Sequence, residues 1–360
     1  MANVTYTVPN KSGSYDGDMV VKQYTSMIID AGDTVTVDQP NRGLFILVKG
    51  DCTINGTLSM TSKGGYINPT TSGGSDSNAV DSNGLRFPFL TSGGSSSLTA
   101  ANTLLNGCGN TARSVIANFK TLSSDGTIIS VVRQGANGAS GVSSTSNGSN
   151  GSNGSTGQSG GGGSGGANYQ GTSGAGSYGS CFSGGSGGGS IDNNGSVTSA
   201  QAWSGAGGNS GTGHSAAGSG GAGNPAGSNA HTQSAGVFVN NADGHGCGGL
   251  IILVVKGNLT IGSNGKIEAN GGGSRNVYRT DDGEWMSTGG AAGGGNIILA
   301  YKGTYTNNGT VEARGGRSGR VHTNANANAG WNNGTSTNTQ THTKTGGLGG
   351  NGSVQTLQVS

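Results

Sequence analysis

Residues 250–272 read LIILVVKGNLTIGSNGKIEANGG, and this stretch contains the pattern that decides the fold. A continuous apolar run is followed by Lys-Gly, a short alternating run, Asn-Gly, a second alternating run and a closing Gly-Gly. The same order occurs in residues 44–65 (LFILVKGDCTINGTLSMTSKGG) and 296–316 (NIILAYKGTYTNNGTVEARGG). Continuous apolar runs are typical of fully buried strands, and alternating runs are typical of half-buried ones. Each copy therefore predicts one buried and two half-buried strands.

The turn signals fall at matching places in the three copies. Asn-Gly is a strong turn signal because both residues tolerate positive φ. Partial copies follow at residues 125–135 (DGTIISVVRQG) and 351–359 (NGSVQTLQV). Repeats of one supersecondary unit bury a continuous core when they stack. We expect β-layers of a solenoid-like or sandwich-like body, with the last copy closing an edge.

Composition limits what the rest of the chain can build. Glycine supplies 78 of the 360 residues, and charged residues make up 9%, against roughly 25% in ordinary domains. A conventional core is largely excluded, so the chain needs hydrogen bonding and repetition to fold, with disorder as the alternative. The net charge of +2 is too weak for a nucleic-acid or acidic-membrane partner. No apolar run reaches membrane-spanning length, and the first residues lack a secretion-signal pattern.

Residues 134–249 form a glycine tract that contains 38 Gly in 116 residues. Seven glycines follow one another at every third position, namely Gly148, Gly151, Gly154, Gly157, Gly160, Gly163 and Gly166. Three residues per turn is the period of a polyproline-II-type helix, which makes no internal hydrogen bonds. The single proline, Pro225, excludes collagen. A flexible linker is the alternative, but the aromatics Tyr169, Tyr178, Phe182 and Trp203 favour packed polyglycine-II helices.

The predicted fold class is therefore all-β with a non-regular glycine-rich scaffold. Residues 1–43, with the alternating runs VTYTV and DTVTV, are expected to form a small β attachment region. Residues 44–133 hold the first β repeat and a partly helical insert near 97–122. The polyglycine-II region spans 134–249, and residues 250–360 hold repeats two and three, their inserts and the closing strand.

Metal and cofactor chemistry find little support in the residue pattern. The cysteines have no CxxC spacing and the histidines no HxH or HExxH spacing, so no metal or cofactor is expected. Packed, reduced thiols are the first expectation, with one bridged pair as the alternative. The cysteines are Cys52, Cys108, Cys181 and Cys247, and the histidines are His214, His231, His245, His322 and His342.

Two inserts between Gly-Gly boundaries collect the aromatic and charged residues. Residues 274–288 contain Tyr278, Arg279, Asp281, Asp282 and Trp285, beside Glu284. A solvated loop, a ligand-contact loop, and a catalytic or calcium site are the alternatives here. Glu268 and Glu312 hold equivalent places in two repeats, which favours a structural role over a glycosidase pair.

The second insert, residues 317–345, contains Arg320, His322 and Trp331 among many amides. Aromatic rings stack on sugar faces and amides both donate and accept, so we expect carbohydrate recognition here. Tyr169 and Trp203 of the glycine tract are further contact candidates. Threonine alternates at 335, 337, 339, 341, 343 and 345, which on a strand gives a one-faced threonine row. An exposed β-surface, a saccharide contact and an ice-binding face are the alternatives for this row.

The triplet glycines 148–166, segments such as GGSGGGS (184–190) and GGAAGGG (289–295), and the aromatic inserts resemble the glycine-rich fibre adhesins of bacteriophages. The distal tail-fibre adhesins of T-even-like phages are the nearest likeness, over about residues 134–350. This resemblance implies a lattice of polyglycine-II helices whose loops bind a bacterial surface receptor. It also implies virion localisation after synthesis in the host cytoplasm, other fibre or tail proteins as partners, and a homo-oligomer such as a trimer.

The expected function is thus a non-enzymatic fibre or tail-tip adhesin for a saccharide or outer-surface protein. A structural fibre shaft or capsid decoration protein is the first alternative. A polysaccharide depolymerase is the second, and an ice-binding protein is the most distant.

Overall fold

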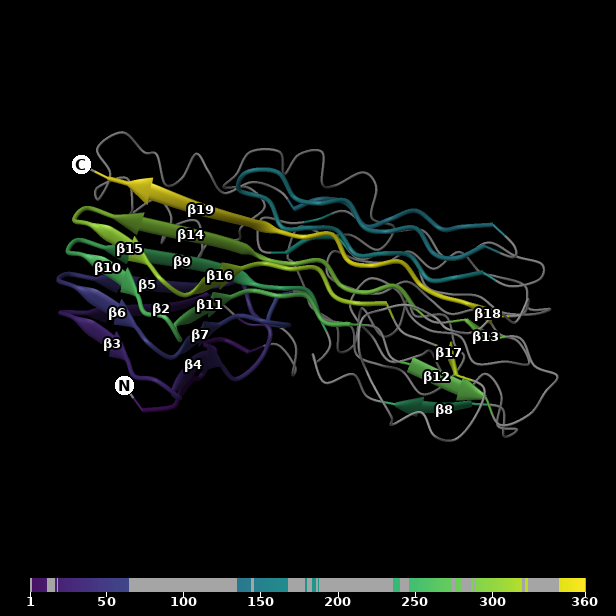
Figure 1. The fold of residues 1–360 in the computed structure, drawn as a ribbon, viewed down its shortest axis with the longest axis horizontal. Helices are drawn as coiled ribbons and strands as arrows, with labels where there is room; N and C mark the ends of the chain where they lie inside the picture. The colour runs from purple at the N-terminus through teal and green to yellow at the C-terminus, as the bar shows by residue number, and fades with distance from the viewer. Residues whose placement is uncertain are drawn as a thin grey trace.

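The computed structural model describes residues 2–11, 17, 19–64, 135–143, 146–167, 179, 183–185, 187, 236–239, 246–273, 276–279, 286–287, 289–318, 321–322 and 343–359. All regular structure in these residues is β-strand, which confirms the expected all-β class at this level. The predicted helical insert at 97–122 and the partial copy at 125–135 lie outside them, apart from Gly135. Figure 1 shows an elongated molecule with both termini at one end.

Stacked coils build one half of the molecule, and each coil gives one strand to each of three parallel sheets. The first sheet contains β2 (Val20–Tyr24), β5 (Leu44–Val48), β9 (Leu250–Val255), β14 (Asn296–Tyr301) and β19 (Ser353–Gln358). The second contains β3 (Met27–Ile29), β6 (Cys52–Ile54), β10 (Leu259–Ile261) and β15 (Tyr305–Asn307). The third contains β1 (Val4–Tyr6), β4 (Thr34–Val37), β7 (Thr57–Ser59), β11 (Lys266–Glu268) and β16 (Thr310–Glu312). The repeats thus form a β-solenoid.

The register of the solenoid stacks equivalent residues of successive repeats. Leu253 pairs with Ile46 on one side and with Leu299 on the other. The strands of residues 1–43 join the same sheets, since β2, β3 and β4 pair with β5, β6 and β7. The last copy, β19, pairs with β14 at the edge of the first sheet, as the sequence predicts.

A continuous apolar core fills the solenoid between its three sheets. Inward residues such as Ile46, Leu253 and Leu299 have 0% exposure and belong to one cluster. Outward residues of β9 and β14, such as Ile252 and Ile298, are also buried. This burial on both faces explains why these strands are apolar without alternation.

The Asn-Gly pair of each of the three repeats forms the corner between two sheets, and the reason for its glycine differs from the expected one. Positive φ among described glycines occurs at Gly32, Gly43, Gly157 and Gly246, so none of the Asn-Gly glycines has it. Instead, a Cβ on Gly265 would lie 2.0 Å from the carbonyl oxygen of Ile54 in the coil below. The expectation of positive φ is therefore wrong, and close stacking between coils explains the glycine.

Side chains complete the hydrogen bonding at another corner. The Asp51 Oδ1 atom accepts from the Asn258 N–H at 2.7 Å, and the Asn258 Oδ1 atom accepts from the Thr304 N–H at 2.9 Å. Backbone groups that would otherwise lack partners at the corners are satisfied in this way.

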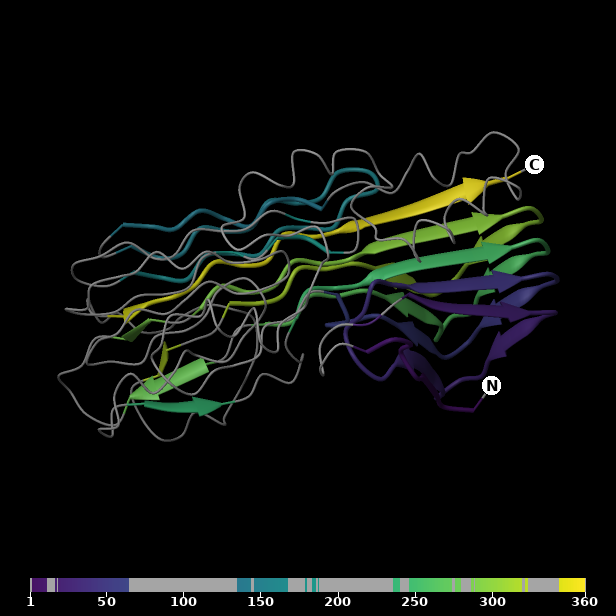
Figure 2. The ribbon, with the colours of Figure 1, turned by 180° about the vertical axis from the view of Figure 1, so that it is seen from behind.

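Glycine-rich segments build the other half of the molecule, and their hydrogen bonds repeat at every third residue. The N–H groups of Gly148, Gly151 and Gly154 each donate at 2.8 Å to carbonyls of residues 345, 348 and 351. These two segments run in the same direction, whereas residues 160–163 run opposite to residues 291–294, since Gly160 and Gly163 donate to Gly294 and Ala291. Most of these hydrogen bonds join different segments. Figures 1 and 2 show the segments as extended traces that run side by side.

The Gly-Gly ends of the solenoid repeats belong to this same bundle. Residues 269–273, 289–295, 313–316 and 345–352 all exchange backbone hydrogen bonds with one another or with the glycine tract. The chain therefore leaves the solenoid directly into the bundle and returns from it. The two halves are consequently continuous.

Each Ser-Asn-Gly triplet of residues 146–154 forms hydrogen bonds with both the N–H and the C=O group of one partner residue. Gly151 donates its N–H to the carbonyl of Leu348 at 2.8 Å, and the Asn150 Oδ1 atom accepts the N–H of Leu348 at 2.9 Å. The pairs Asn147-Gly148 and Asn153-Gly154 bind residues 345 and 351 in the same way. Each Asn-Gly pair thus fixes the register of one triplet against the neighbouring segment.

Glycine is required in this bundle because the segments touch through their backbones. Residues 161–167, GGGSGGA, are all buried. A Cβ on Gly163 would lie 2.4 Å from the carbonyl oxygen of Gly347, and one on Gly290 would lie 1.6 Å from that of Gly163. Real Cβ atoms do not approach backbone atoms so closely, so larger residues are excluded from these positions.

Candidate functional site

The two inserts that the sequence analysis singles out are brought together by β-pairing. Strand β12 (Asn276–Arg279) of the first insert pairs in parallel with β17 (Val321–His322) of the second. Strand β13 (Met286–Ser287) likewise pairs with β18 (Thr343–Lys344). Contacts made by either insert can therefore act on one ligand.

A third segment joins this small sheet. Strand β8 (Gly236–Val239) pairs antiparallel with β12. The sequence analysis does not predict this strand. Its signal is the run GVFV, which is apolar and β-branched inside a polar, glycine-rich tract. The site thus combines residues from the end of the glycine tract with both inserts.

The register separates two rows of residues on this sheet. Tyr278 pairs with His322 and with Val237, whereas Val277 pairs with Val321 and Phe238. The register therefore aligns Tyr278 with His322, and it aligns the apolar residue Val277 with Val321 and Phe238.

Three predicted contact residues lie in these strands. Tyr278 and His322 are register partners, and Arg279 pairs with Gly236 at the next position of β12. The remaining candidates lie outside the described residues, namely Asp281, Asp282, Trp285, Arg320, Trp331, Tyr169 and Trp203.

The predicted threonine row is described at Thr343 and Thr345, and its other members lie outside the described residues. Thr343 lies in β18, where it pairs with Met286. Thr345 belongs to the glycine bundle, because its backbone binds Asn147 and Gly148.

The small sheet lies at the end of the molecule opposite both termini. Figures 1 and 2 show β8, β12 and β17 at one end, the solenoid strands at the other, and the glycine segments between them. A ligand held by the inserts is therefore far from the termini.

A pair of carboxylates on the solenoid surface is the other feature that could take part in chemistry. Glu268 and Glu312 are direct register partners in β11 and β16. Glu268 accepts from the Ser59 hydroxyl at 2.9 Å, and Glu312 accepts from the Asn270 amide at 2.9 Å and pairs with Arg314 at 2.7 Å. These contacts offset like-charge repulsion between neighbouring strands and agree with a structural role.

The described cysteines are buried thiols and not ligands. Cys52 and Cys247 are both buried as thiols. Burial raises the pKa of Cys52 to about 12 and raises that of Cys247, so both stay protonated at neutral pH. Within the part of the chain that the structure describes, no cluster of three or more His, Cys, Asp or Glu side chains could hold a metal. Cys108 and Cys181 lie outside that part.

Among the described residues, no helix is long and apolar enough to cross a membrane. The geometry of this chain defines a three-sided solenoid, a glycine bundle and a terminal insert sheet. Comparison with known proteins gives no match to a family model, a curated protein or a solved structure.

Proposed function

We propose that this protein is a non-enzymatic adhesin at the tip of a bacteriophage fibre or tail, where it binds a bacterial surface receptor. The observation that carries the proposal is the strand pairing of the two inserts, in two small sheets at the end opposite the termini. Tyr278 and His322, whose residue types carry an aromatic ring and a hydrogen-bonding group, are register partners in β12 and β17. Such groups suit recognition of a saccharide.

We further propose that the glycine-rich segments are polyglycine-II helices packed in a bundle. Three observations support this: the bonds repeat every three residues, they run between segments, and Cβ atoms are excluded at the contacts. A polyproline-II-type helix has three residues per turn and no internal hydrogen bonds. A bundle of this kind would hold the inserts rigidly away from the solenoid, which lowers the entropic cost of binding.

The proposal is tested by measuring how the purified protein binds to a panel of bacterial strains. Trp285→Ala and Trp331→Ala remove the largest aromatic side chains of the two inserts. We expect each to weaken cell binding by about tenfold or more, as loss of a central aromatic contact does. Ile28→Ala is the control, because Ile28 is 52% exposed on β3 at the other end.

The unfolding transition must stay unchanged in both tryptophan variants, since their role is contact and not packing. Unaltered cell binding by both would refute these contact assignments. Release of reducing sugar ends from the bacterial capsule during the same incubation would identify a depolymerase instead. Symmetric assemblies that bury the inserts would identify a shaft or decoration protein.

A further inference from the structure

Three lysines stack at one corner of the solenoid. Val48, Val255 and Tyr301 are register partners in β5, β9 and β14, and each is followed directly by a lysine. Lys49, Lys256 and Lys302 therefore occupy neighbouring strands at one level, about 4.8 Å apart along the stack. We call these three residues the lysine ladder.

The lysine ladder is exposed and has no internal counter-charge. All three side chains are exposed, and none forms an ion pair or side-chain hydrogen bond with any of the described residues. Asp51, the nearest acid in sequence, accepts its hydrogen bond from the Asn258 backbone. Like charges on neighbouring strands destabilise a sheet. In a chain with only 9% charged residues, this stacking therefore has a cost that folding does not explain.

Tyrosines border the lysine ladder on the last complete coil. Tyr301 and Tyr305 flank Lys302 in sequence, and their rings stack with centroids 5.3 Å apart. Both rings are half-buried and pack against the solenoid core, so part of each ring surface stays accessible on this coil. Tyrosine is among the residues enriched at the centres of protein–protein interfaces. The last complete coil thus carries one lysine of the ladder together with partly exposed aromatic rings.

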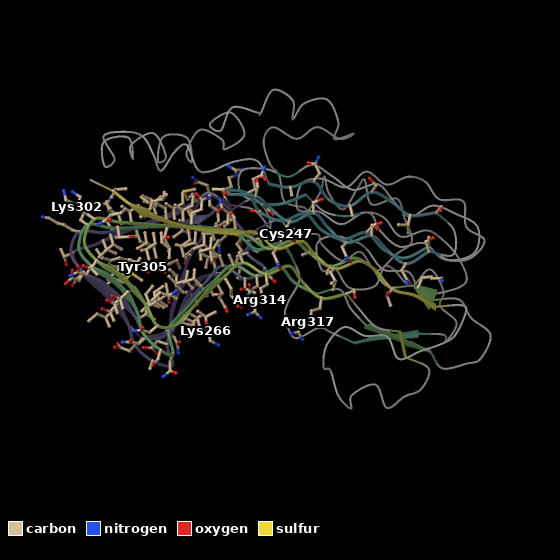
Figure 3. All side chains as sticks on the ribbon, turned by 45° about the horizontal axis from the view of Figure 1, so that its top comes forward. Cys247, Lys266, Lys302, Tyr305, Arg314 and Arg317 are labelled. Carbon is tan, nitrogen blue, oxygen red and sulfur yellow. The ribbon has the colours of Figure 1, made fainter. Side chains whose placement is uncertain are left out.

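The ladder lies at the end of the molecule that carries both termini. Figure 3 shows Lys302 at this end, with Lys266 and Arg317 farther along the molecule. The insert sheet occupies the opposite end in Figures 1 and 2. A partner that binds the ladder therefore leaves the inserts accessible.

We infer that the lysine ladder docks an acidic protein surface, with carboxylates spaced to match neighbouring strands. Three ammonium groups at a fixed spacing match Asp or Glu side chains on adjacent strands, as a parallel β-structure would present them. The inference rests on the proposed function only in naming the partner as another protein of the same particle. The charge complementarity itself is independent of any receptor.

The experiment uses the full-length chain and a fluorescent peptide that contains six glutamates, with binding followed by fluorescence anisotropy at low and physiological salt. The test variant is K49Q/K256Q/K302Q. The matched control, K11Q/K266Q/R314Q, removes the same charge from exposed residues outside both the ladder and the inserts. We expect the test variant to lose at least about tenfold in affinity and the control to stay within about twofold. Unfolding curves confirm that all three proteins are folded.

Failure of the wild-type protein to bind the peptide would overturn the inference. Equal loss in both variants would also overturn it, because net charge alone would then explain binding. A sulfated heparin hexasaccharide serves as the second probe. Tighter, ladder-dependent binding of that saccharide than of the peptide would assign the ladder to a polyanionic sugar and refute the protein partner. None of these results depends on receptor binding by the inserts.

Discussion

The solenoid and the glycine bundle are stabilised in opposite ways within one chain. In the solenoid, large apolar side chains such as Leu253 and Ile46 fill the space between three sheets. In the bundle, residues 161–167 are buried without any side chain larger than that of Ala or Ser. The solenoid core depends on large apolar side chains. In the bundle, any added side-chain carbon would separate the backbones that hydrogen-bond each other. Burial alone therefore does not indicate which kind of core a segment forms.

The largest loss of stability should come from shortening a buried apolar side chain in the solenoid. Leu253 has 0% exposure and stacks between Ile46 and Leu299. We expect Leu253→Ala to lower the free energy of unfolding by about 2–5 kcal/mol, through lost burial and a residual cavity. Denaturant unfolding measures this. A loss below about 1 kcal/mol would mean that the solenoid core is not tightly packed.

The next largest loss of stability should come from adding a methyl group at a backbone contact in the bundle. Gly163→Ala places a methyl group 2.4 Å from the Gly347 carbonyl oxygen, and backbone atoms on both sides must shift. We expect a loss of about 1–3 kcal/mol, comparable to overpacking elsewhere. Ser152→Ala is the control because Ser152 is exposed in a neighbouring segment, and it should be nearly neutral. Thermal unfolding of both variants measures this difference in stability. A neutral Gly163→Ala would contradict the backbone packing proposed for the bundle.

The solenoid repeats could be predicted because they carry two periodic signals at once, apolar runs and fixed Lys-Gly and Asn-Gly pairs. The first coil lacks these landmarks, since Thr25 and Ser26 stand at its Lys-Gly corner, so its strands read as a separate β region. The bundle's extension into residues 345–352 has a signal, because Gly346, Gly349 and Gly352 also keep period three. That period alone does not identify the segment to which each triplet binds.

The candidate site could be predicted in part. Aromatic and charged residues mark both inserts, but pairing of β12 with β17 joins segments that are more than forty residues apart. Such pairing depends on the lengths and register of the glycine segments between them. No local pattern encodes it, and the short strand β8 gave too weak a signal within its tract.

A smaller effect should come from the side-chain acceptors that fix the register of the bundle. Asn150→Ala removes the Oδ1 atom that accepts the Leu348 N–H at 2.9 Å. We expect a loss of about 0.5–1.5 kcal/mol in unfolding free energy, the usual contribution of one hydrogen bond. Asn150→Asp keeps an acceptor oxygen and should retain most of the stability. Equal losses in the two variants would argue against the hydrogen bond as the cause.

The smallest effect concerns a surface ion pair at the first coil. Burial alone would raise the pKa of Asp38, but hydrogen bonds from Lys11 and from the Val8 amide lower it overall. A lowered folded-state pKa means that the stabilisation is present above the unfolded pKa of about 3.9 and is lost as the pH falls below it. The difference in unfolding free energy between wild type and Asp38→Asn should be below about 1 kcal/mol at pH 7 and should shrink further toward pH 3. A difference that grows on acidification would contradict this assignment.

Amide hydrogen exchange across residues 146–154, resolved by NMR, tests most directly whether the glycine segments form a hydrogen-bonded bundle. The amides of Gly148, Gly151 and Gly154 donate to neighbouring segments, whereas those of Asn150 and Asn153 donate to no described residue. We predict slow exchange at these glycines and fast exchange at the two asparagines. Ser149 should also be protected, because its N–H donates to the Ser164 hydroxyl oxygen at 2.8 Å. Uniformly fast exchange through the segment would show a flexible linker and would contradict the account.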